Sequence, residues 1–403
     1  MSLSVAGVAP RDVVVPRSID EVSETVRELY GARKPFAFVG GGTHLDLGNP
    51  PRALDTVVRT TALDAILDYT PEDQTITVQA GITLAELDRA LEQHGQMLPL
   101  DAADRESATV GGVVAVNAYG RRRLRYGTAK DLILGVEIVR PDGVCARGGG
   151  KVVKNVAGFD LPKLMVGSLG TLGGIVSLTF RLYPIPPATR AAVLHFEREE
   201  PIGVLEALTA RRLEPESVVL YNYSALVVTF AGTEAGVEAQ LRTLLDEIAR
   251  ECRAADASEL SELERESYEQ RERAVRRDGP WRLHVVAPPS DRVATLANVV
   301  PASPLAVPVA YPTIGVAYHA LSDATFAGGP DASPDWHVGG LRDMVAVATG
   351  GRGHVVFDAI PDAARPLVDA WGPPPPSFPL MRTLKNNFDQ YGLCNPGRFV
   401  GGL

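Results

Sequence analysis

The amino-acid sequence predicts a two-domain protein of the α+β class. Its 403 residues exceed what a single hydrophobic core usually serves. A proline cluster at 184–187 separates two patterns: short strands with glycine-rich turns precede it, and strands alternating with helices follow it. Prolines end a sheet and stiffen a linker, so this cluster is the predicted first domain boundary.

Composition and charge are those of an ordinary globular protein, with 45% hydrophobic and 22% charged residues. The net charge of −9 and the pI near 5.4 argue against nucleic acid as a main partner. The first sixteen residues lack the basic start and long apolar core of a signal peptide. The longest uncharged stretch, 294–322, contains four prolines and suits short strands better than a membrane helix. We therefore expect no transmembrane segment and a cytoplasmic location.

The three cysteines, Cys145, Cys252 and Cys394, lie far apart in the sequence. An odd number of distant cysteines predicts reduced thiols and no disulfide framework. The sequence also lacks the closely spaced cysteines that hold an iron–sulfur cluster, so such a cluster would belong to another chain.

The first glycine loop follows a predicted strand at 35–39, which itself follows an amphipathic helix at 19–30. Consecutive glycines at 40–42 allow backbone N–H groups to point into a concavity that attracts phosphate. A dinucleotide-binding Rossmann turn is excluded, because the prolines at 50 and 51 prevent the helix that such a turn requires. Taken alone, the loop is better explained as a simple turn that ends a strand.

The second glycine loop, at 108–112, follows a supporting segment with predicted strands at 56–58 and 75–79 and a helix at 84–94 that Thr83 caps. A buried pyrophosphate needs several N–H groups and a hydroxyl, which this loop offers through Thr109. Thr109 also suits the N-cap of a helix at 110–117, and both roles can hold together. The arginines at 121–125 fit a solvated loop or a site for phosphate or an acidic partner equally well.

The third glycine-rich segment, 148–180, follows a predicted hairpin with strands at 133–140 and 144–147. Lys151, Lys154 and Asn155 are the polar residues of this segment that we expect nearest a ligand, although both lysines also suit the surface. The β-branched run from Ile175 onward predicts a return to the sheet.

These three segments, 38–50, 108–132 and 148–180, occur in an order and spacing that resemble the FAD-binding domain of the vanillyl-alcohol oxidase and p-cresol methylhydroxylase (PCMH) flavoprotein family. Within that family the chain is most similar to the FAD-binding accessory subunit of bacterial glycolate oxidase. The resemblance implies a two-part PCMH-type FAD-binding domain at 1–186, an α+β cap on an antiparallel sheet at 187–376, and a C-terminal segment at 377–403 that returns to the FAD domain through Asn395-Pro396-Gly397-Arg398.

The resemblance also implies which residues bind FAD, with the backbone of 170–173 contacting the adenosine half. Gly174 stands where family members usually have a bulky aliphatic residue, so we expect looser packing there. His44 lies one position later than the histidine that some members link to flavin, which reverses its side-chain direction and predicts non-covalent binding. The implied cofactor-binding residues are Gly40, Gly41, Gly42, Thr43, His44, Asp101, Thr109, Gly111, Gly112, Asn117, Gly120, Gly174 and Ile175.

The second half predicts a cap built on one antiparallel sheet. His319, His337 and His354 show no metal-site spacing on one helix, so we assign neither a metal nor a catalytic base. The predicted strands are 192–196, 218–221, 226–231, 281–287, 313–320 and 354–360, and the predicted helices are 202–209, 234–252, 258–277, 290–299 and 341–348.

The implied function is that of an FAD-dependent oxidoreductase subunit in a glycolate oxidase-like complex. Electrons would pass from a small 2-hydroxy acid through the flavin to partner subunits, an iron–sulfur subunit among them. Such partners could hold the chain at the inner membrane. Two alternatives stay open: an FAD-binding structural or relay subunit without its own substrate site, and a stand-alone oxidase of sugars or alcohols.

Overall fold

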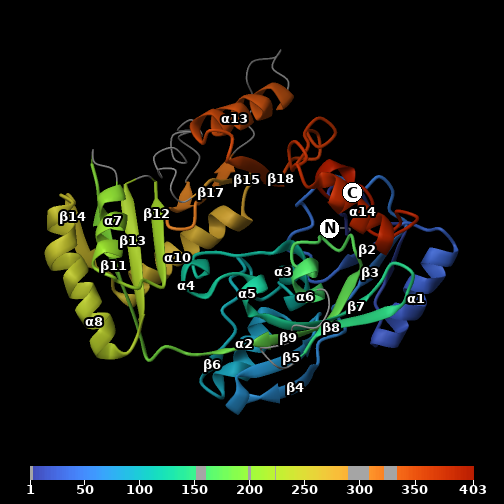
Figure 1. Ribbon diagram of the computed structural model, residues 1–403, viewed down its shortest axis with the longest axis horizontal. Coiled ribbons are helices and arrows are strands. Elements are labelled where there is room, and N and C mark those ends of the chain that lie inside the picture. Colours follow the sequence, from blue (N-terminus) through green and yellow to red (C-terminus); the bar gives the residue numbers. More distant parts are fainter. Residues whose placement is uncertain (1–2, 151–159, 198–200, 223, 289–307, 322–333) are drawn as a thin grey trace. The chain divides into compact units, whose positions relative to one another are not determined.

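The computed structural model describes residues 3–150, 160–197, 201–222, 224–288, 308–321 and 334–403. Its internal contacts divide the chain into two units (Figure 1). The first unit comprises Met1–Tyr119, Gly127–Ile185 and Asp369–Leu403, and the second comprises Gly120–Tyr126 and Pro186–Val368. Lys151, Lys154, Asn155 and the helix predicted at 290–299 lie outside the described residues.

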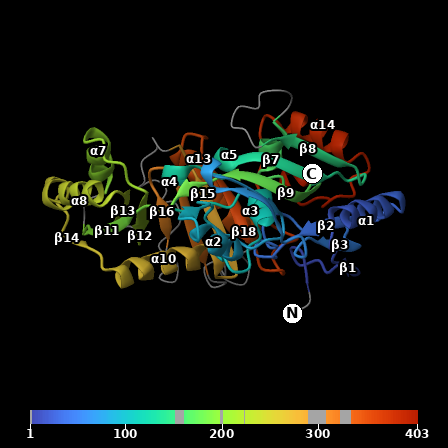
Figure 2. The ribbon, with the colours of Figure 1, turned by 90° about the horizontal axis from the view of Figure 1, so that it is seen from below.

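One part of the first unit is a parallel three-stranded sheet of order β1-β3-β2, formed by β1 (Asp12–Val14), β3 (Thr56–Arg59) and β2 (Phe36–Val39). Helix α1 (Ile19–Gly31) lies beside this sheet in both ribbon views (Figures 1 and 2). The Ser18 side chain caps α1 by accepting a hydrogen bond from the Glu21 amide. The apolar face of α1 packs on Phe36 and Val58 of the sheet, as its periodicity predicts.

The other part of the first unit is a five-stranded antiparallel sheet, in which β9 is the central strand and is buried from Gly174 to Phe180. Helix α2 (Leu84–Glu92), capped by Thr83 as predicted, packs its leucines into the core of this sheet. The strand order is β4 (Ile66–Thr70), β5 (Thr75–Gln79), β9 (Gly174–Arg181), β7 (Ile133–Val139), β8 (Cys145–Gly149).

The remaining elements of the first unit are short, apart from one helix near the C-terminus. They are β6 (Gln96–Met97) paired with β10 (Tyr183–Pro184), α3 (Val110–Val116), α5 (Ala129–Leu132), α6 (Leu161–Met165), α14 (Phe378–Phe388) and 3-10 turns at Pro71–Asp73 and Val400–Gly402.

The second unit is built on one eight-stranded antiparallel sheet, which confirms the predicted architecture of the cap. Helix α8 packs on β11 and β13, α10 on β15 and β17, and α13 on β18. The strand order is β14 (Asp256–Glu259), β11 (Ala188–His195), β13 (Ala225–Gly232), β12 (Ser217–Tyr221), β16 (Val309–Tyr311), β17 (Val316–Leu321), β15 (Trp281–Val286), β18 (His354–Ala359). Its helices are α4 (Arg123–Tyr126), α7 (Ile202–Ala210), α8 (Glu234–Thr243), a π-helical turn (Leu244–Ile248), α9 (Ala249–Glu251), α10 (Glu262–Arg277) and α13 (Pro334–Ala348).

Several predicted element boundaries in this unit are wrong. Helix α13 begins at Pro334 instead of residue 341, and strand β11 begins at Ala188 instead of residue 192. The helix predicted at 258–277 begins only at Glu262, because Ser261 and Glu264 form a capping box there, while the residues before it pair with β11 as the edge strand β14. The strand predicted from residue 313 begins at Val316, because the Ile314 amide first closes a turn to the Tyr311 carbonyl. The π-helical turn also interrupts the single helix predicted at 234–252.

The arginine cluster at 121–125 has a structural role that neither sequence interpretation anticipated. Arg121 is 8% exposed and lies 2.8 Å from Glu269 Oε2 and 3.5 Å from Glu216 Oε2. Arg125 donates a hydrogen bond to the Ala231 carbonyl. All these partners belong to the second unit. The solvated-loop interpretation is therefore wrong for Arg121, whose charge is buried and paired with two carboxylates.

The three cysteines are free thiols, as predicted. Cys394 is fully buried, and burial raises the pKa of its thiol to about 12. Within the ranges that the structure describes, none of the helices combines the length and the apolar character needed to cross a bilayer.

Candidate cofactor-binding site

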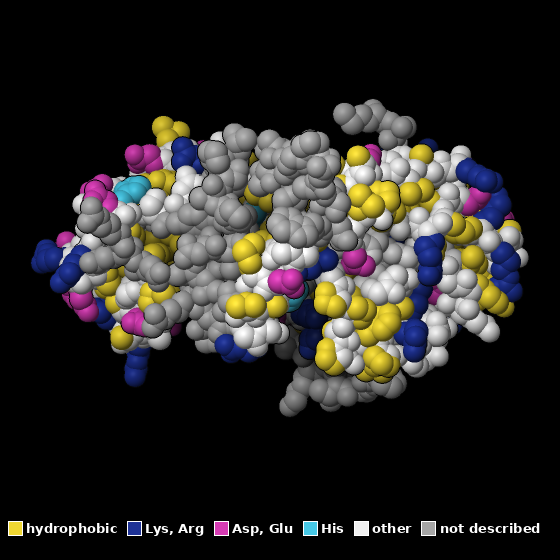
Figure 3. Space-filling view, turned by 90° about the horizontal axis from the view of Figure 1, so that it is seen from above, with side chains coloured by type: hydrophobic (Ala, Val, Ile, Leu, Met, Phe, Trp, Pro, Cys, Tyr) yellow, Lys and Arg dark blue, Asp and Glu magenta, His cyan; other side chains and the backbone are white. Residues whose placement is uncertain are grey.

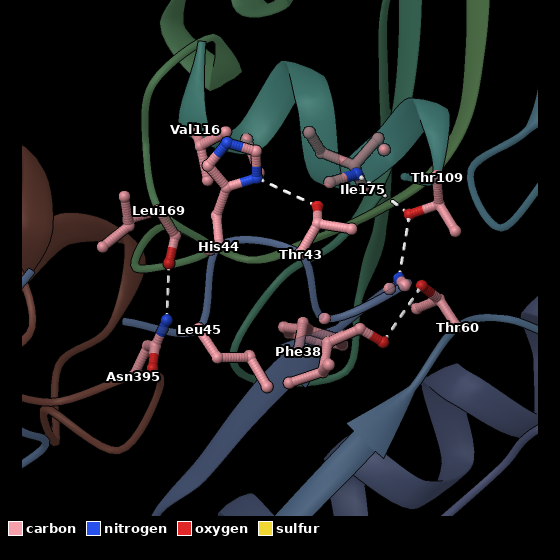
Figure 4. A pocket seen from close by; sticks show the side chains of 18 of the residues that line it. Phe38, Thr43, His44, Leu45, Thr60, Thr109, Val116, Leu169, Ile175 and Asn395 are labelled. Carbon is pink, nitrogen blue, oxygen red and sulfur yellow. Dashed lines mark hydrogen bonds between the residues drawn. The ribbon is translucent and has the colours of Figure 1, made fainter. Parts of the chain in front are cut away.

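A pocket of about 90 Å³ lies within the first unit, where the three glycine-rich segments meet the C-terminal segment (Figure 4). The first loop follows β2, the second forms the start of α3, and the third precedes β9. The structure brings together Gly40, Gly41, Gly42, Thr43, His44, Thr109, Gly111, Gly112 and Ile175 of the predicted site, along with Gly170 and Gly173.

The first two loops approach so closely that only glycine fits between them. A Cβ atom on Gly40 would lie 2.0 Å from Thr109 Oγ1, and one on Gly41 would lie 1.7 Å from the Ser107 carbonyl oxygen. Gly42 has a φ of +80°, a left-handed conformation that glycine adopts without strain. The glycine run therefore lets one backbone loop lie directly on another.

Thr109 joins these two loops through its hydroxyl. Its Oγ1 accepts hydrogen bonds from the amides of Gly41 and Gly112, each at 3.3 Å, so the predicted N-cap role is confirmed. Within the described part of the chain, the amides of Gly42 and Thr43 make no hydrogen bond. These donors therefore remain available to an anionic ligand.

The charge around the pocket also suits an anion. Arg398 is 3% exposed, and it is the one Lys, Arg, Asp or Glu side chain among the described residues that line the pocket. Its guanidinium donates to the carbonyl oxygens of Leu45 at 3.0 Å and Leu47 at 2.6 Å. A buried guanidinium beside backbone amides, with no carboxylate in the lining, is the environment that a pyrophosphate group requires.

The C-terminal segment contributes two lining residues, Asn395 and Arg398, that were predicted only as part of a returning tail. The segment pairs with β2, because Phe36 exchanges backbone hydrogen bonds with Leu393 at 2.9 Å and Asn395 at 2.7 Å. The Asn-Pro-Gly-Arg motif predicted that the C-terminal segment returns to the FAD domain, but it did not predict which side chains line the pocket.

Several predicted site residues do not line this pocket: Asp101, Asn117, Gly120 and Gly174. Asn117 ends α3 in a left-handed conformation, and Gly120 belongs to the second unit. The looser packing expected at Gly174 is wrong, because the Phe38 ring fills the space: a Cβ there would lie 2.3 Å from that ring. The contacts of these four residues with the cofactor remain predictions.

His44 lies at the pocket with its ring beside Thr43 (Figure 4). Its Nδ1 is 3.0 Å from Thr43 Oγ1. The histidine therefore has a hydroxyl as a hydrogen-bonding neighbour at the edge of the pocket.

The second unit contains a histidine–carboxylate pair that the sequence reasoning missed. His284 Nδ1 on β15 lies 2.9 Å and 3.0 Å from the two carboxylate oxygens of Asp358 on β18. The His284 side chain is 17% exposed, and its Nε2 makes no hydrogen bond with any described residue. The pairing register of the two strands brings this pair together. His284 is opposite Val356, and Asp358, two residues further along β18, lies on the same face of the sheet.

The predicted cap histidines are not assembled into a metal site in the described part of the second unit. His319 lies 1% exposed on β17, and burial lowers its pKa to about 4, so the ring is neutral. His354 begins β18 at an exposed position, and the side chain of His337 lies outside the described residues.

Comparison with known proteins defines the class. Residues 10–149 match the sequence family described as an FAD binding domain. The fold is that of p-cresol methylhydroxylase, with a TM-score of 0.71 over 96% of this chain and 88% of that chain at 15% identity. Alkyldihydroxyacetonephosphate synthase superposes with a TM-score of 0.68 over 96% of this chain and 77% of that chain at 16% identity. The chain therefore contains an FAD-binding domain in a PCMH-type fold, which confirms both the predicted fold and FAD as the cofactor.

Curated relatives are similar over about half of this chain. Glycolate oxidase subunit GlcD of Bacillus subtilis is 30% identical over 237 residues, which is 59% of this chain and 50% of that protein. Glycolate oxidase subunit GlcE of Escherichia coli is 34% identical over 217 residues, or 54% of this chain and 61% of that protein. D-2-hydroxyglutarate dehydrogenase of Xanthomonas citri is 35% identical over 46% of this chain and 39% of its own length. The chain thus matches about half the length of these relatives.

The purified chain is expected to carry roughly one FAD, held without a covalent bond. Acid precipitation should release the flavin into the supernatant, where chromatography identifies it. FMN, or no flavin at all, would contradict the assignment of the cofactor. Flavin fluorescence that stays with the denatured polypeptide and disappears in His44→Ala would instead show that His44 is a covalent anchor.

Proposed function

We propose that this chain is the FAD-binding oxidoreductase subunit of a glycolate oxidase-like complex that oxidises a small 2-hydroxy acid. The observation that carries the proposal is the pocket itself. The amides of Gly42 and Thr43, which make no hydrogen bond in the described part of the chain, and the buried positive charge of Arg398 suit a pyrophosphate. The names of the relatives, glycolate oxidase subunits and a D-2-hydroxyglutarate dehydrogenase, support the substrate class. We further propose the predicted division into an FAD domain at 1–186, a cap at 187–376 and a return segment at 377–403.

The glycine loops, Thr109 and Arg398 would hold FAD, which supplies a two-electron acceptor when bound. Oxidation of a 2-hydroxy acid to a 2-oxo acid also releases the hydroxyl proton, which needs an acceptor.

A second candidate is an FAD-binding relay subunit without its own substrate site. It is favoured by similarity to two differently named glycolate oxidase subunits, GlcD and GlcE, because a complex with two such subunits needs only one substrate site. In either case electrons would pass to partner subunits, an iron–sulfur subunit among them, and those partners would provide any contact with the inner membrane.

The first unit has exposed hydrophobic side chains that could contact such partner subunits. Figure 3 shows hydrophobic and basic side chains next to each other over this unit, on the right of the view. Two large side chains of the C-terminal segment are exposed on this unit, Leu380 on α14 at 63% and Tyr391 at 43%.

The deciding measurement is anaerobic reduction of the bound flavin, followed by its absorbance. Glycolate, D-lactate and D-2-hydroxyglutarate are expected to bleach the flavin of the chain alone, whereas glucose is not. Bleaching only after partner subunits are added supports the relay subunit, and bleaching by glucose alone supports a stand-alone sugar oxidase.

A further inference from the structure

Asn395 is a buried amide on the wall of the cofactor pocket. It is 4% exposed, and its Nδ2 lies 2.5 Å from the carbonyl oxygen of Leu169 (Figure 4). A carbonyl oxygen can only accept a hydrogen bond, so the side-chain atom facing it must be the nitrogen. This contact fixes the orientation of the amide and identifies the other atom as Oδ1.

The Oδ1 atom is buried and has no hydrogen-bond partner within the described part of the chain. A buried acceptor without a partner is costly, and native proteins rarely keep one unless a ligand or water completes it. Other polar groups in the lining, the Gly42 and Thr43 amides and the Arg398 guanidinium, are donors. Asn395 Oδ1 is therefore an acceptor in a pocket otherwise suited to bind oxygen anions.

We infer that Asn395 contacts the cofactor and that its Oδ1 accepts a hydrogen bond from a hydroxyl or amino group adjoining the pyrophosphate of FAD. The inference rests on the proposed cofactor site. Ionised phosphate oxygens carry no proton to donate, so the pyrophosphate itself cannot satisfy this atom. The donor belongs to the adenosine half or to the ribityl chain of the riboflavin half.

Hydrogen bonds to two different segments fix the position of Asn395 and of the residue before it. The backbone N–H of Asn395 donates a hydrogen bond to the Phe36 carbonyl oxygen at 2.7 Å. The preceding residue, Cys394, donates from its Sγ to the Gly170 carbonyl oxygen at 3.0 Å. Both neighbours belong to segments that enter the pocket. Asn395 has a φ of +51°, a left-handed conformation that asparagine tolerates better than most residues.

The test is Asn395→Gly, since glycine keeps the left-handed backbone and removes the amide. The dissociation constant of FAD, measured on apoprotein by fluorescence titration, should rise about tenfold, the usual effect of losing one buried hydrogen bond. The inhibition constant of inorganic pyrophosphate against FAD binding should change less than about twofold, because pyrophosphate cannot use Oδ1. ADP and FMN represent the two halves of FAD. The half whose affinity for Asn395→Gly falls together with that of FAD carries the group that donates to Asn395 Oδ1.

Tyr391→Ala is the matched control, because this side chain of the same segment packs on Tyr30 and Arg33, which do not line the pocket. Its thermal midpoint should fall, while FAD affinity stays within about threefold of wild type. Asn395→Ser, too short to reach both Leu169 and the cofactor, should reproduce the result of Asn395→Gly. Wild-type FAD affinity in either Asn395 variant, or an equal loss of pyrophosphate and FAD affinity, would overturn the inference. A wild-type chain that binds no FAD would instead refute the proposed cofactor site.

Discussion

Gly41→Ala is expected to empty the pocket of flavin. The added Cβ would lie 1.7 Å from the Ser107 carbonyl oxygen, far inside van der Waals contact, and the obstacle is backbone that no rotamer change can remove. The first glycine loop must therefore move away from the second, which breaks the bond from the Gly41 amide to Thr109 and displaces the free amides beyond it. Flavin occupancy should fall at least about tenfold, which corresponds to about 1.4 kcal/mol or more of binding free energy.

Two other glycines provide the controls for this experiment. Gly31→Ala adds a Cβ with no heavy atom within 4 Å, so flavin occupancy should not change. At Gly112 the nearest atom to an added Cβ is Thr109 Oγ1 at 3.1 Å, so alanine should be milder than at Gly41. Gly112→Glu should remove flavin nonetheless, because it brings a carboxylate to an anion site. Normal occupancy in both Gly41→Ala and Gly112→Glu, measured as flavin absorbance per folded chain, would show that these loops do not hold the cofactor.

Local patterns were enough to predict the glycine loops and the strands around them. The strand at Thr75–Gln79 and the capped helix after Thr83 depend on side-chain alternation and on a cap, and both signals lie within a few neighbouring residues. Thr109 was identifiable as an N-cap for the same reason. The pocket wall built from these loops therefore follows closely from the sequence.

The part of the pocket formed by Asn395 and Arg398, which we call the C-terminal wall, could not be predicted in the same way. Arg398 contacts the residues after the first glycine loop across a separation of about 350 residues, as the Arg398–Leu45 and Arg398–Leu47 hydrogen bonds show. No periodic pattern encodes a contact over that distance. Leu169 likewise meets Asn395 only because two distant loops end at one pocket.

Two predicted site residues that do not line the pocket were assigned because they lie close in sequence to a glycine loop. Asn117 and Gly120 follow the second loop, yet α3 ends at Asn117 with a left-handed turn and the chain then crosses into the second unit. The arginines beyond it consequently meet Glu216 and Glu269 instead of phosphate. Distance along the chain is a poor guide once a helix cap redirects the backbone.

Lys385→Met is expected to unfold the C-terminal wall and release flavin with it. Lys385 Nζ donates to Asp389 Oδ2 at 2.6 Å, to the Thr171 carbonyl at 2.7 Å and to the Cys394 carbonyl at 2.8 Å. Both charged side chains are almost completely buried, so methionine would leave the Asp389 carboxylate without its countercharge. Breaking such a pair usually costs about 3–5 kcal/mol, which predicts a fall of roughly 10 °C in the thermal midpoint.

An exposed pair with the same sequence spacing isolates the effect of burial. Arg242 and Glu238 are also four residues apart on one helix, but their side chains are 67% and 53% exposed. Arg242→Met should therefore shift the midpoint by no more than about 1 °C, because solvent already screens that pair. Flavin loss should follow Lys385→Met alone, since the bond to Thr171 ties α14 to the loop between Gly170 and Gly173 that lines the pocket. Equal midpoints for the two variants would mean that Lys385 does not anchor this wall, and full flavin retention after Lys385→Met would separate the anchor from the cofactor site.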